Sequence, residues 1–423
     1  MVWRPAAERL AAEGTSRRPA RARAAAAALA GAKPHSAARP ISPALFYALT
    51  VASIGGPLAL IALQIPPALS GAGSSAGLVT LVGTLAFFFP LLIWVRYSER
   101  IASSGGLYAF VEAAVGRPVA LVQAGFWILS YFLYLIYTVP FIVYDLLPAV
   151  FPRVHQLALV LDLVLALIIA VIMLSPLIVV LGVLAAIALA QVLIAVILVV
   201  ATFSHLGLPI ASFTGHGNYA AIALASARTS SLYICASLPL FLAAEVRDGG
   251  RTVQRALQWA FPAVGALAII AVFPLARVQQ SIIDTPIPGV ALTQATGFYA
   301  FAPVIALGVA VSVAGLIFAE FLALTRLLWT LVNRPRRLLT LAAVAAFVIG
   351  TLVSLINPAR AYDVLLKPSL IALWIAQLLV VVVYPWFVAK QRVVRAGDIG
   401  LAGAASLLML FALYSAITSG SGT

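Results

Sequence analysis

Long apolar segments separated by short polar ones repeat along most of this chain. Eleven of them are long enough to cross a bilayer as helices, because a crossing takes about 20 mostly apolar residues. Only Ser175 and Pro176 separate the fourth segment from the fifth. The pattern therefore predicts an all-α integral membrane protein, with spans near residues 44–66, 74–96, 118–147, 157–174, 177–202, 230–246, 257–276, 301–328, 338–356, 364–388 and 398–418.

The first apolar segment is interrupted near its middle by Ser53-Ile54-Gly55-Gly56-Pro57. A membrane helix must satisfy its own backbone, because each polar group left bare in hydrocarbon costs several kcal/mol. Two glycines followed by a proline favour a break in that hydrogen-bond ladder. A break of this kind persists only where protein surrounds it or a cavity borders it. We therefore expect a binding site within the membrane at Ser53, Ile54, Gly55 and Gly56.

A second interruption is predicted five segments later, in residues 230–246. Pro239 removes a helical donor and crowds the preceding turn, so carbonyl groups near Cys235 lose their partners. Ser231 and Ser237 offer hydroxyl groups beside the gap. A simple proline kink, repaired by neighbouring helices, is the alternative. Helical transporters often carry broken helices at matching positions of two inverted repeats, so the spacing favours a second half-site within residues 230–246.

Paired breaks of this kind have a simple chemistry. The amino end of one half-helix presents free N–H groups and a positive dipole to an anion such as a carboxylate. Unwound carbonyl groups and the carboxyl end of another half-helix accept hydrogen bonds from an ammonium group. A molecule with both groups would be held from two sides, which describes an amino acid. Leu232, Ile234 and Ala236 indicate an apolar side-chain pocket beside the second break.

Composition and charge support the membrane assignment and add an orientation. Hydrophobic residues make up 64% of the 423 positions and charged residues only 9%, which is unlike a soluble domain. The net charge of +14 does not indicate nucleic acid, because most of the 26 basic residues lie on one side of the predicted spans. The positive-inside rule then predicts a cell-membrane protein with a cytoplasmic amino terminus and an outside carboxyl terminus. The basic residues on the opposite side are Arg153, Arg228, Arg277, Arg360 and Lys367.

Residues 1–40 form a separate basic tail rich in alanine and arginine. We expect this tail to be disordered or loosely helical, and cytoplasmic. A transit peptide or a misassigned start codon would give a similar pattern, and we assign the tail no function.

Two loops between the spans resemble loops of the amino acid–polyamine–organocation permeases. Residues 103–108, Ser-Ser-Gly-Gly-Leu-Tyr, are similar to that family's Gly-Gly-x-Tyr loop. Residues 244–256 resemble its Glu-Val-x-Asn-Pro-x-Arg-x-x-Pro-Arg-Ala segment, and residues 326–334 resemble a further short segment. The resemblance implies a leucine-transporter-like fold within residues 41–420, with inverted repeats of five spans at about 44–202 and 230–388 and an extra helix at about 398–418.

The resemblance also implies a function. The family consists of permeases that move an amino acid or a related small amine by alternating access, through proton symport or exchange. Carried over by position, the substrate carboxylate would be received by Ser53, Ile54, Gly55 and Gly56. Its amino group and side chain would be received by Tyr233, Ile234, Cys235, Ala236 and Ser237. Cys235-Ala236-Ser237 stands where many relatives have Gly-x-Glu, and Gln191 stands where some proton-coupled relatives have a lysine. The twelfth span of many relatives has no counterpart here.

Glu320 is the acidic residue that most needs an explanation, because a mid-membrane carboxylate costs ~2.5–3.5 kcal/mol on insertion scales. In the implied fold its span borders the ion site beside the first span, so Glu320 is a candidate carrier of the coupling proton. The alternative is a structural pair with an inner-side arginine; Arg326 lies about 9 Å away along the helix axis. Asp145 and Asp162 lie near the outer ends of their spans, and we expect both at the headgroups. Glu245 either forms a salt bridge at an inner gate or is solvated.

Three tyrosines, Tyr131, Tyr134 and Tyr137, share one face of the third span. In the implied fold this span faces the first, so Tyr131 is a candidate gate over the substrate. Packing or anchoring at the membrane interface is the alternative for the set.

Other classes of function match the residues less well. An intramembrane enzyme would need a histidine–aspartate cluster, a cysteine–histidine pair or a metal site, and a channel would need rings of polar side chains. The single cysteine, three methionines and four histidines form no such pattern. We therefore expect no catalytic residues, metal or cofactor, and partners limited to a small-molecule substrate, lipid and protons. A sensor on the same fold that does not transport is a further alternative.

Overall fold

The computed structural model describes residues 40–215, 218–332 and 334–418. Within these ranges the regular structure is helical, and the extended pairing is limited to one bridge between Ile41 and Val246. Eleven helices of the described chain are long and apolar enough to cross a membrane. The predicted number of spans is therefore confirmed, and the chain is a multi-pass membrane protein. The predicted disorder of the basic tail falls outside the described residues, apart from its last position.

Most spans begin and end near their predicted limits, but the sixth and seventh start earlier. The sixth begins at Tyr219 and not at residue 230, because its first half is rich in alanine, serine and threonine and hydropathy alone missed it. Asn218 caps this start, since its side-chain oxygen accepts from the N–H groups of Ala220 and Ala221. The spans are Pro43–Ala68, Gly73–Ser98, Arg117–Leu146, Val154–Leu174, Leu177–Leu206, Tyr219–Glu245, Gly249–Arg277, Tyr299–Leu331, Arg336–Ser354, Arg360–Ala389 and Ala396–Thr418.

Two of the spans are divided in a way that matters for the site. The first consists of α2 (Pro43–Ser53), α3 (Pro57–Ala59), the π-helix η1 (Leu60–Gln64) and α4 (Ile65–Ala68). The sixth consists of α11 (Tyr219–Ser231) and the 3₁₀ helix η5 (Ile234–Glu245).

The other α-helices, in chain order, are α5 (Ala76–Ala86), α6 (Phe88–Ser98), α7 (Leu107–Val115), α8 (Arg117–Pro140), α9 (Val154–Leu174), α10 (Leu177–Leu206), α12 (Gly249–Val272), α13 (Gln280–Ile283), α14 (Pro288–Ala295), α15 (Ala302–Leu331), α16 (Arg336–Ser354), α17 (Pro358–Val382), α18 (Tyr384–Ala389) and α19 (Ala396–Thr418). The short π- and 3₁₀ helices are η2 (Gly73–Ser75), η3 (Phe141–Leu146), η4 (Ile210–Phe213), η6 (Phe273–Arg277) and η7 (Tyr299–Phe301).

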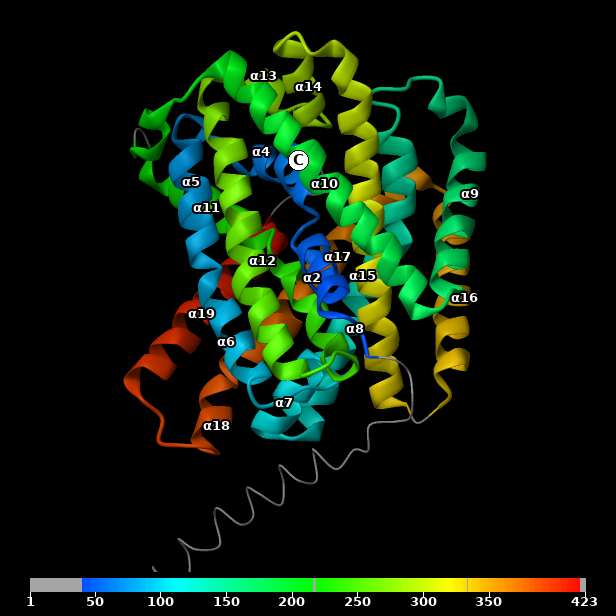
Figure 1. Ribbon diagram of the computed structural model, residues 1–423, viewed down its shortest axis with the longest axis vertical. Coiled ribbons are helices and arrows are strands. Elements are labelled where there is room, and N and C mark those ends of the chain that lie inside the picture. Colours follow the sequence, from blue (N-terminus) through cyan, green and yellow to red (C-terminus); the bar gives the residue numbers. More distant parts are fainter. Residues whose placement is uncertain (1–39, 216–217, 333, 419–423) are drawn as a thin grey trace, which may run out of the picture.

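The first span lies in the interior of the bundle and is the most buried of the eleven. Figure 1 shows α2 and α4 near the middle, with an unwound segment between them. α9 and α16 pack together at one side, and α19 packs against α6, α17 and α18 at the other. Buried apolar side chains form one continuous core around the divided spans.

Segments predicted to share one side of the membrane lie together at one end of the bundle. Gln254 Nε2 donates to Glu99 Oε1 (3.5 Å), and Lys390 Nζ donates to the carbonyl of Ala113 (2.9 Å). This end, where α6, α15 and α18 finish and α12, α16 and α19 start, is called the basic end below. Its contacts agree with the predicted alternation of spans, and its assignment to the cytoplasm stays a prediction.

Candidate functional site

The first span unwinds over three residues between α2 and α3. Gly55 and Gly56 have φ angles of 66° and 60°, in the left-handed region that side chains disfavour. Ser53 and Ile54 are fully buried, and the Ser53 hydroxyl donates to a carbonyl of its own helix. The predicted break is therefore present and enclosed by protein, although the Ser53 side chain is already occupied.

The first break leaves backbone donors without partners. The N–H groups of Gly56 and Leu58 make no hydrogen bond among the described residues. The N–H of Ala59 donates to Ser312 Oγ on α15 (3.2 Å), and Ser312 Oγ donates to Gln191 Oε1 on α10 (2.8 Å). The structure thus brings Gln191 to the first break through Ser312, which the sequence analysis did not select.

The second break lies at Leu232 and Tyr233, slightly before its predicted centre at Cys235. These residues connect the end of α11 to the start of η5. η5 keeps 3₁₀ winding for 12 residues, although runs longer than three or four residues are uncommon and often mark a hinge. Pro239 lies within η5, and the 3₁₀ winding continues through it, so the break does not fall at Pro239.

The two breaks meet inside the bundle. A Cβ atom added to Gly55 would stand 3.2 Å from the backbone carbonyl oxygen of Leu232. α2 also packs directly against η5. A carbonyl group of the second break therefore lies beside the unwound backbone of the first, as a paired site requires.

The residues predicted for the second half-site do not all face the first break. Tyr233 packs on Phe261, and its hydroxyl group hydrogen-bonds with Thr84 Oγ1 on α5 (2.9 Å). Its side chain therefore points towards α5, and only its backbone stays at the break. Ile234 and Ala236 are buried and apolar.

Ser237 connects η5 to α17. Its Oγ donates to the carbonyl of Ile234 (3.1 Å) and accepts from Gln377 Nε2 (3.2 Å). Gln377 Oε1 is buried without a partner among the described residues. The sequence analysis overlooked Gln377, although a single glutamine in an otherwise apolar run of α17 is a signal that could have identified it.

Glu320 lies in the interior and is fully buried on α15. The Cys235 thiol donates to its Oε1 (3.8 Å), while Oε2 has no partner among the described residues. Tyr131 is buried, and its hydroxyl group lies close enough to Cys235 and Glu320 to interact with both electrostatically. The alternative of a structural pair with an inner-side arginine is not seen among the described residues, since Glu320 forms no ion pair there and the Arg326 guanidinium binds Glu245.

Glu245 holds several segments together at the basic end. Its Oε1 and Oε2 accept from Arg326 (3.2 and 3.4 Å), and Oε1 also accepts from Arg336 (2.8 Å). Its backbone carbonyl accepts from the N–H of Ile41 (2.9 Å), just before α2. We call this arrangement the basic-end clasp. It confirms the salt-bridge interpretation of Glu245 over plain solvation.

One face of α8 carries buried polar groups from the basic end towards Glu320. Gln123, Trp127 and Tyr131 follow at four-residue spacing, and their side-chain polar atoms have no hydrogen-bond partners among the described residues. The ring of Trp127 lies 4.5 Å from that of Phe241 on η5. Phe241 in turn packs against Gly106, where an added Cβ would stand 2.5 Å from its ring. Phe241 therefore covers Trp127 at the middle of this polar face of α8.

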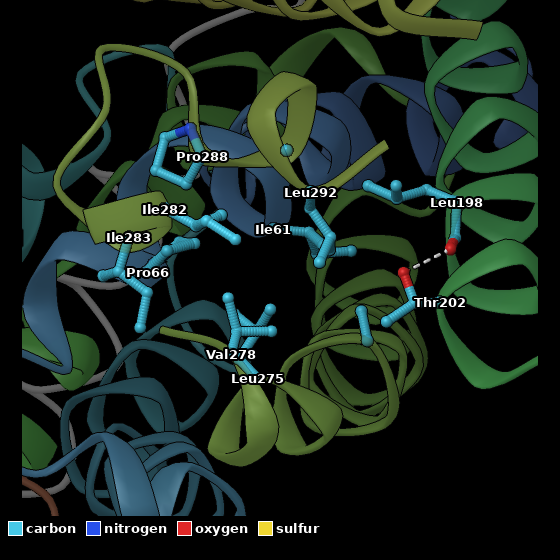
Figure 2. Close-up of a pocket in the computed structure, with 12 residues that line it drawn as sticks. Ile61, Pro66, Leu198, Thr202, Leu275, Val278, Ile282, Ile283, Pro288 and Leu292 are labelled. Atoms are coloured by element: carbon cyan, nitrogen blue, oxygen red, sulfur yellow. Dashed lines mark hydrogen bonds between the residues drawn. The ribbon is translucent and has the colours of Figure 1, made fainter. Parts of the chain in front are cut away.

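A small apolar pocket lies at the end of the bundle opposite the basic end. Figure 2 shows Ile61 and Pro66 of the first span facing residues that include Ile283 and Leu292, near α13 and α14. Its volume of about 10 Å³ holds roughly one water molecule. α14 packs closely here, since a Cβ on Gly289 would stand 2.5 Å from that of Ala62. This cover over the first span was not predicted.

The position of Asp162 differs from the prediction that it lies at the headgroups. Its side chain on α9 is fully buried, and neither carboxylate oxygen has a hydrogen-bond partner among the described residues. Neighbouring helices cover it because α9 packs against η3 and α16, which hydropathy of α9 alone does not reveal. It is not among the residues that line the breaks.

Comparison with known proteins finds no protein-family model and no curated protein that matches this chain.

Proposed function

We propose that this protein is a secondary transporter that moves an amino acid or a related small amine across the membrane by alternating access. The observation that carries the proposal is the meeting of two helix breaks, with Gly55 against the Leu232 carbonyl inside a bundle of eleven spans. Unwound backbone inside a membrane bundle is tolerated where it surrounds a binding site. The proposed fold is two inverted repeats of five spans plus one extra helix, related to the amino acid–polyamine–organocation permeases.

The substrate would lie between the two breaks. The unpartnered N–H groups of Gly56 and Leu58 suit a carboxylate, and the amino end of the helical run from Pro57 adds a favourable dipole. The Leu232 carbonyl suits an ammonium group. The apolar residues Ile54 and Ile234 border the same region and favour an uncharged side chain.

Glu320 is the proposed carrier of a coupling proton. An isolated ionised carboxylate in apolar surroundings is costly, so such a group takes up a proton or a cationic partner. Its observed hydrogen bond comes from Cys235 in η5, next to the second break. Protonation of Glu320 would therefore change a contact that touches the substrate region. This position makes proton symport the favoured mode of transport.

Alternating access needs a closure on each side of the site. At the basic end we assign this role to the basic-end clasp and to Phe241 over the polar face of α8. At the opposite end we assign it to α14, which packs on the first span at Gly289. The long 3₁₀ helix η5 joins the second break to the clasp and is the proposed moving element.

Cys235 gives a direct test of the binding site, because it is the only cysteine and is partly accessible. We expect a transported amino acid at ten times its Kd to slow alkylation of Cys235 in proteoliposomes by about tenfold, through occupancy of the site. Uptake of single labelled amino acids and of putrescine identifies the substrate, and maleimide labelling measures the rate. The Cys235→Ser variant must not label, and sucrose must not protect. Uptake without any protection of Cys235 would overturn the placement of the second break.

Glu245→Gln tests the basic-end clasp. Loss of hydrogen bonds to two charged partners is expected to shift the population towards the state open at the basic end by about tenfold, equivalent to roughly 1.4 kcal/mol. Cys235 should then react correspondingly faster with an impermeant maleimide added from that side. Asp248→Asn is the matched control, because it removes one negative charge from the same loop at an exposed position. Equal rates in the two variants would contradict the proposed role of the clasp.

A further inference from the structure

A second cavity lies at the basic end, far from the helix breaks. Its volume is about 310 Å³, and it opens between the end of α6 and the segment from α18 to α19. Its floor is apolar and aromatic, formed by Tyr384, Phe387 and Val388. Its rim carries the polar and charged residues Arg96, Glu99, Arg100, Gln391 and Arg392. A cavity of this size is large enough for a small ligand or a headgroup.

Asp398 fixes two of the three arginines of this cavity. Arg392 Nη1 and Nη2 donate to its two oxygens (2.7 and 2.8 Å), and Arg96 Nη1 donates to Oδ1 (3.0 Å). Arg96 Nη1 also donates to the hydroxyl of Tyr384 (3.0 Å). Asp398 is almost fully buried, whereas the arginine side chains remain 42% and 44% exposed. Since each guanidinium has five N–H donors, both keep donors free for a ligand.

The charges of the cavity fit one monoanion. The three arginines of the cavity face two carboxylates, Glu99 at the rim and Asp398 behind the arginines. The net charge of this group is therefore +1. Guanidinium groups that are held in place bind phosphate oxygens well, because their paired N–H groups match the spacing of those oxygens. A phosphodiester carries a single negative charge.

The surroundings of the cavity point to a lipid as the carrier of this phosphate. Arg96 is near the end of a span, so the cavity lies at the membrane boundary. Phe89 and Leu92 precede Arg96 by seven and four residues on the same face of α6, and both are exposed to the bilayer. Trp386 on α18 is also exposed, three residues before the end of its span, and tryptophans are enriched at such span ends. Acyl chains could therefore follow α6 away from a headgroup in the cavity.

We propose that this cavity binds the headgroup of an anionic phospholipid through Arg96, Arg100 and Arg392. The site is independent of the proposed transport function. Arg100 lies at the rim without an ion pair among the described residues, so it can be changed without disturbing the cluster around Asp398. Glu99 lies beside Arg100, and its negative charge repels the bound anion.

The test uses the purified full-length protein, with thermal unfolding and native mass spectrometry as readouts during titration with phosphatidylglycerol. We expect stabilisation by phosphatidylglycerol and not by phosphatidylcholine. Arg100→Gln should weaken binding about fivefold, since one basic residue near an anionic headgroup contributes about that factor, and Glu99→Gln should strengthen it by a similar factor. Arg251→Gln, which removes an exposed charge at the start of α12, is the control and should change nothing.

Two results would overturn the proposal. One is binding of phosphatidylglycerol that is equally strong in the Arg100→Gln and Arg251→Gln variants. The other is equal stabilisation by inorganic phosphate alone, which would make the cavity a site for soluble anions.

Discussion

Glu320→Gln is expected to abolish accumulation of substrate against its gradient while leaving exchange of labelled for unlabelled substrate intact. Glutamine keeps the shape of Glu320 and can still accept from the Cys235 thiol, but it cannot take up and release a proton. A gradient of one pH unit is worth 1.36 kcal/mol per proton and so supports about tenfold accumulation in a one-to-one symporter. Proteoliposomes with an imposed pH gradient should show this tenfold accumulation for the native chain and none for the variant.

Asp284→Asn provides the matched control for Glu320→Gln. Asp284 is an exposed residue that bonds Gln280 beyond the seventh span, so its neutralisation should leave accumulation unchanged. Full accumulation by Glu320→Gln would show that Glu320 does not carry the proton. Exchange by the native chain with no response to the pH gradient would instead identify an exchanger.

Much of the fold was predictable because the membrane constrains each span locally. Apolar segments of about 20 residues cross a membrane as helices that satisfy their own backbones, so the number of spans followed from hydropathy. The break at Gly55 and Gly56 was also predictable from the sequence, since two glycines can adopt the left-handed backbone seen here and the following proline interrupts a helix. The start of the sixth span was missed because alanine, serine and threonine can line a buried helix without raising its hydropathy.

The site was harder to predict because its partners are distant in sequence. Ser312 reaches the N–H of Ala59 across 253 positions, and Gln377 reaches Ser237 across 140. No local pattern distinguishes the serine that caps a half-helix from one that bonds its own turn. The orientation of Tyr233 depends likewise on Phe261, which belongs to another span.

The charged groups around Glu320 illustrate the same limit, because their partners are also distant in sequence. Its sequence neighbourhood left a proton carrier and a pair with an inner-side arginine equally open. The choice depended on Glu245, which lies 81 positions from Arg326 and binds it at the basic end. Glu320 Oε2 is left without a partner among the described residues, because the Arg326 guanidinium binds Glu245 and residues six apart do not share a face of a helix.

Gly56→Ala is expected to reduce transport to background and to lower the thermal unfolding temperature. Gly56 has a φ of 60°, where a side chain costs about 1–2 kcal/mol. Its new Cβ would stand 2.6 Å from Ser312 Oγ, which must then leave Gln191 Oε1 and the N–H of Ala59. Each lost hydrogen bond adds about 1 kcal/mol, so the break should lose its geometry and substrate affinity should fall at least tenfold.

Gly125→Ala separates this effect from a general intolerance to added methyl groups. Gly125 lies in α8 with no other atom within 4 Å of a new Cβ, so alanine should stabilise its helix by up to about 1 kcal/mol. Uptake and unfolding of the two variants are measured side by side in the same lipid. If Gly56→Ala transports as well as Gly125→Ala, the unwound backbone does not form the substrate site. If Gly56→Ala fails while Gly125→Ala transports normally, the unwound backbone sets the geometry of that site.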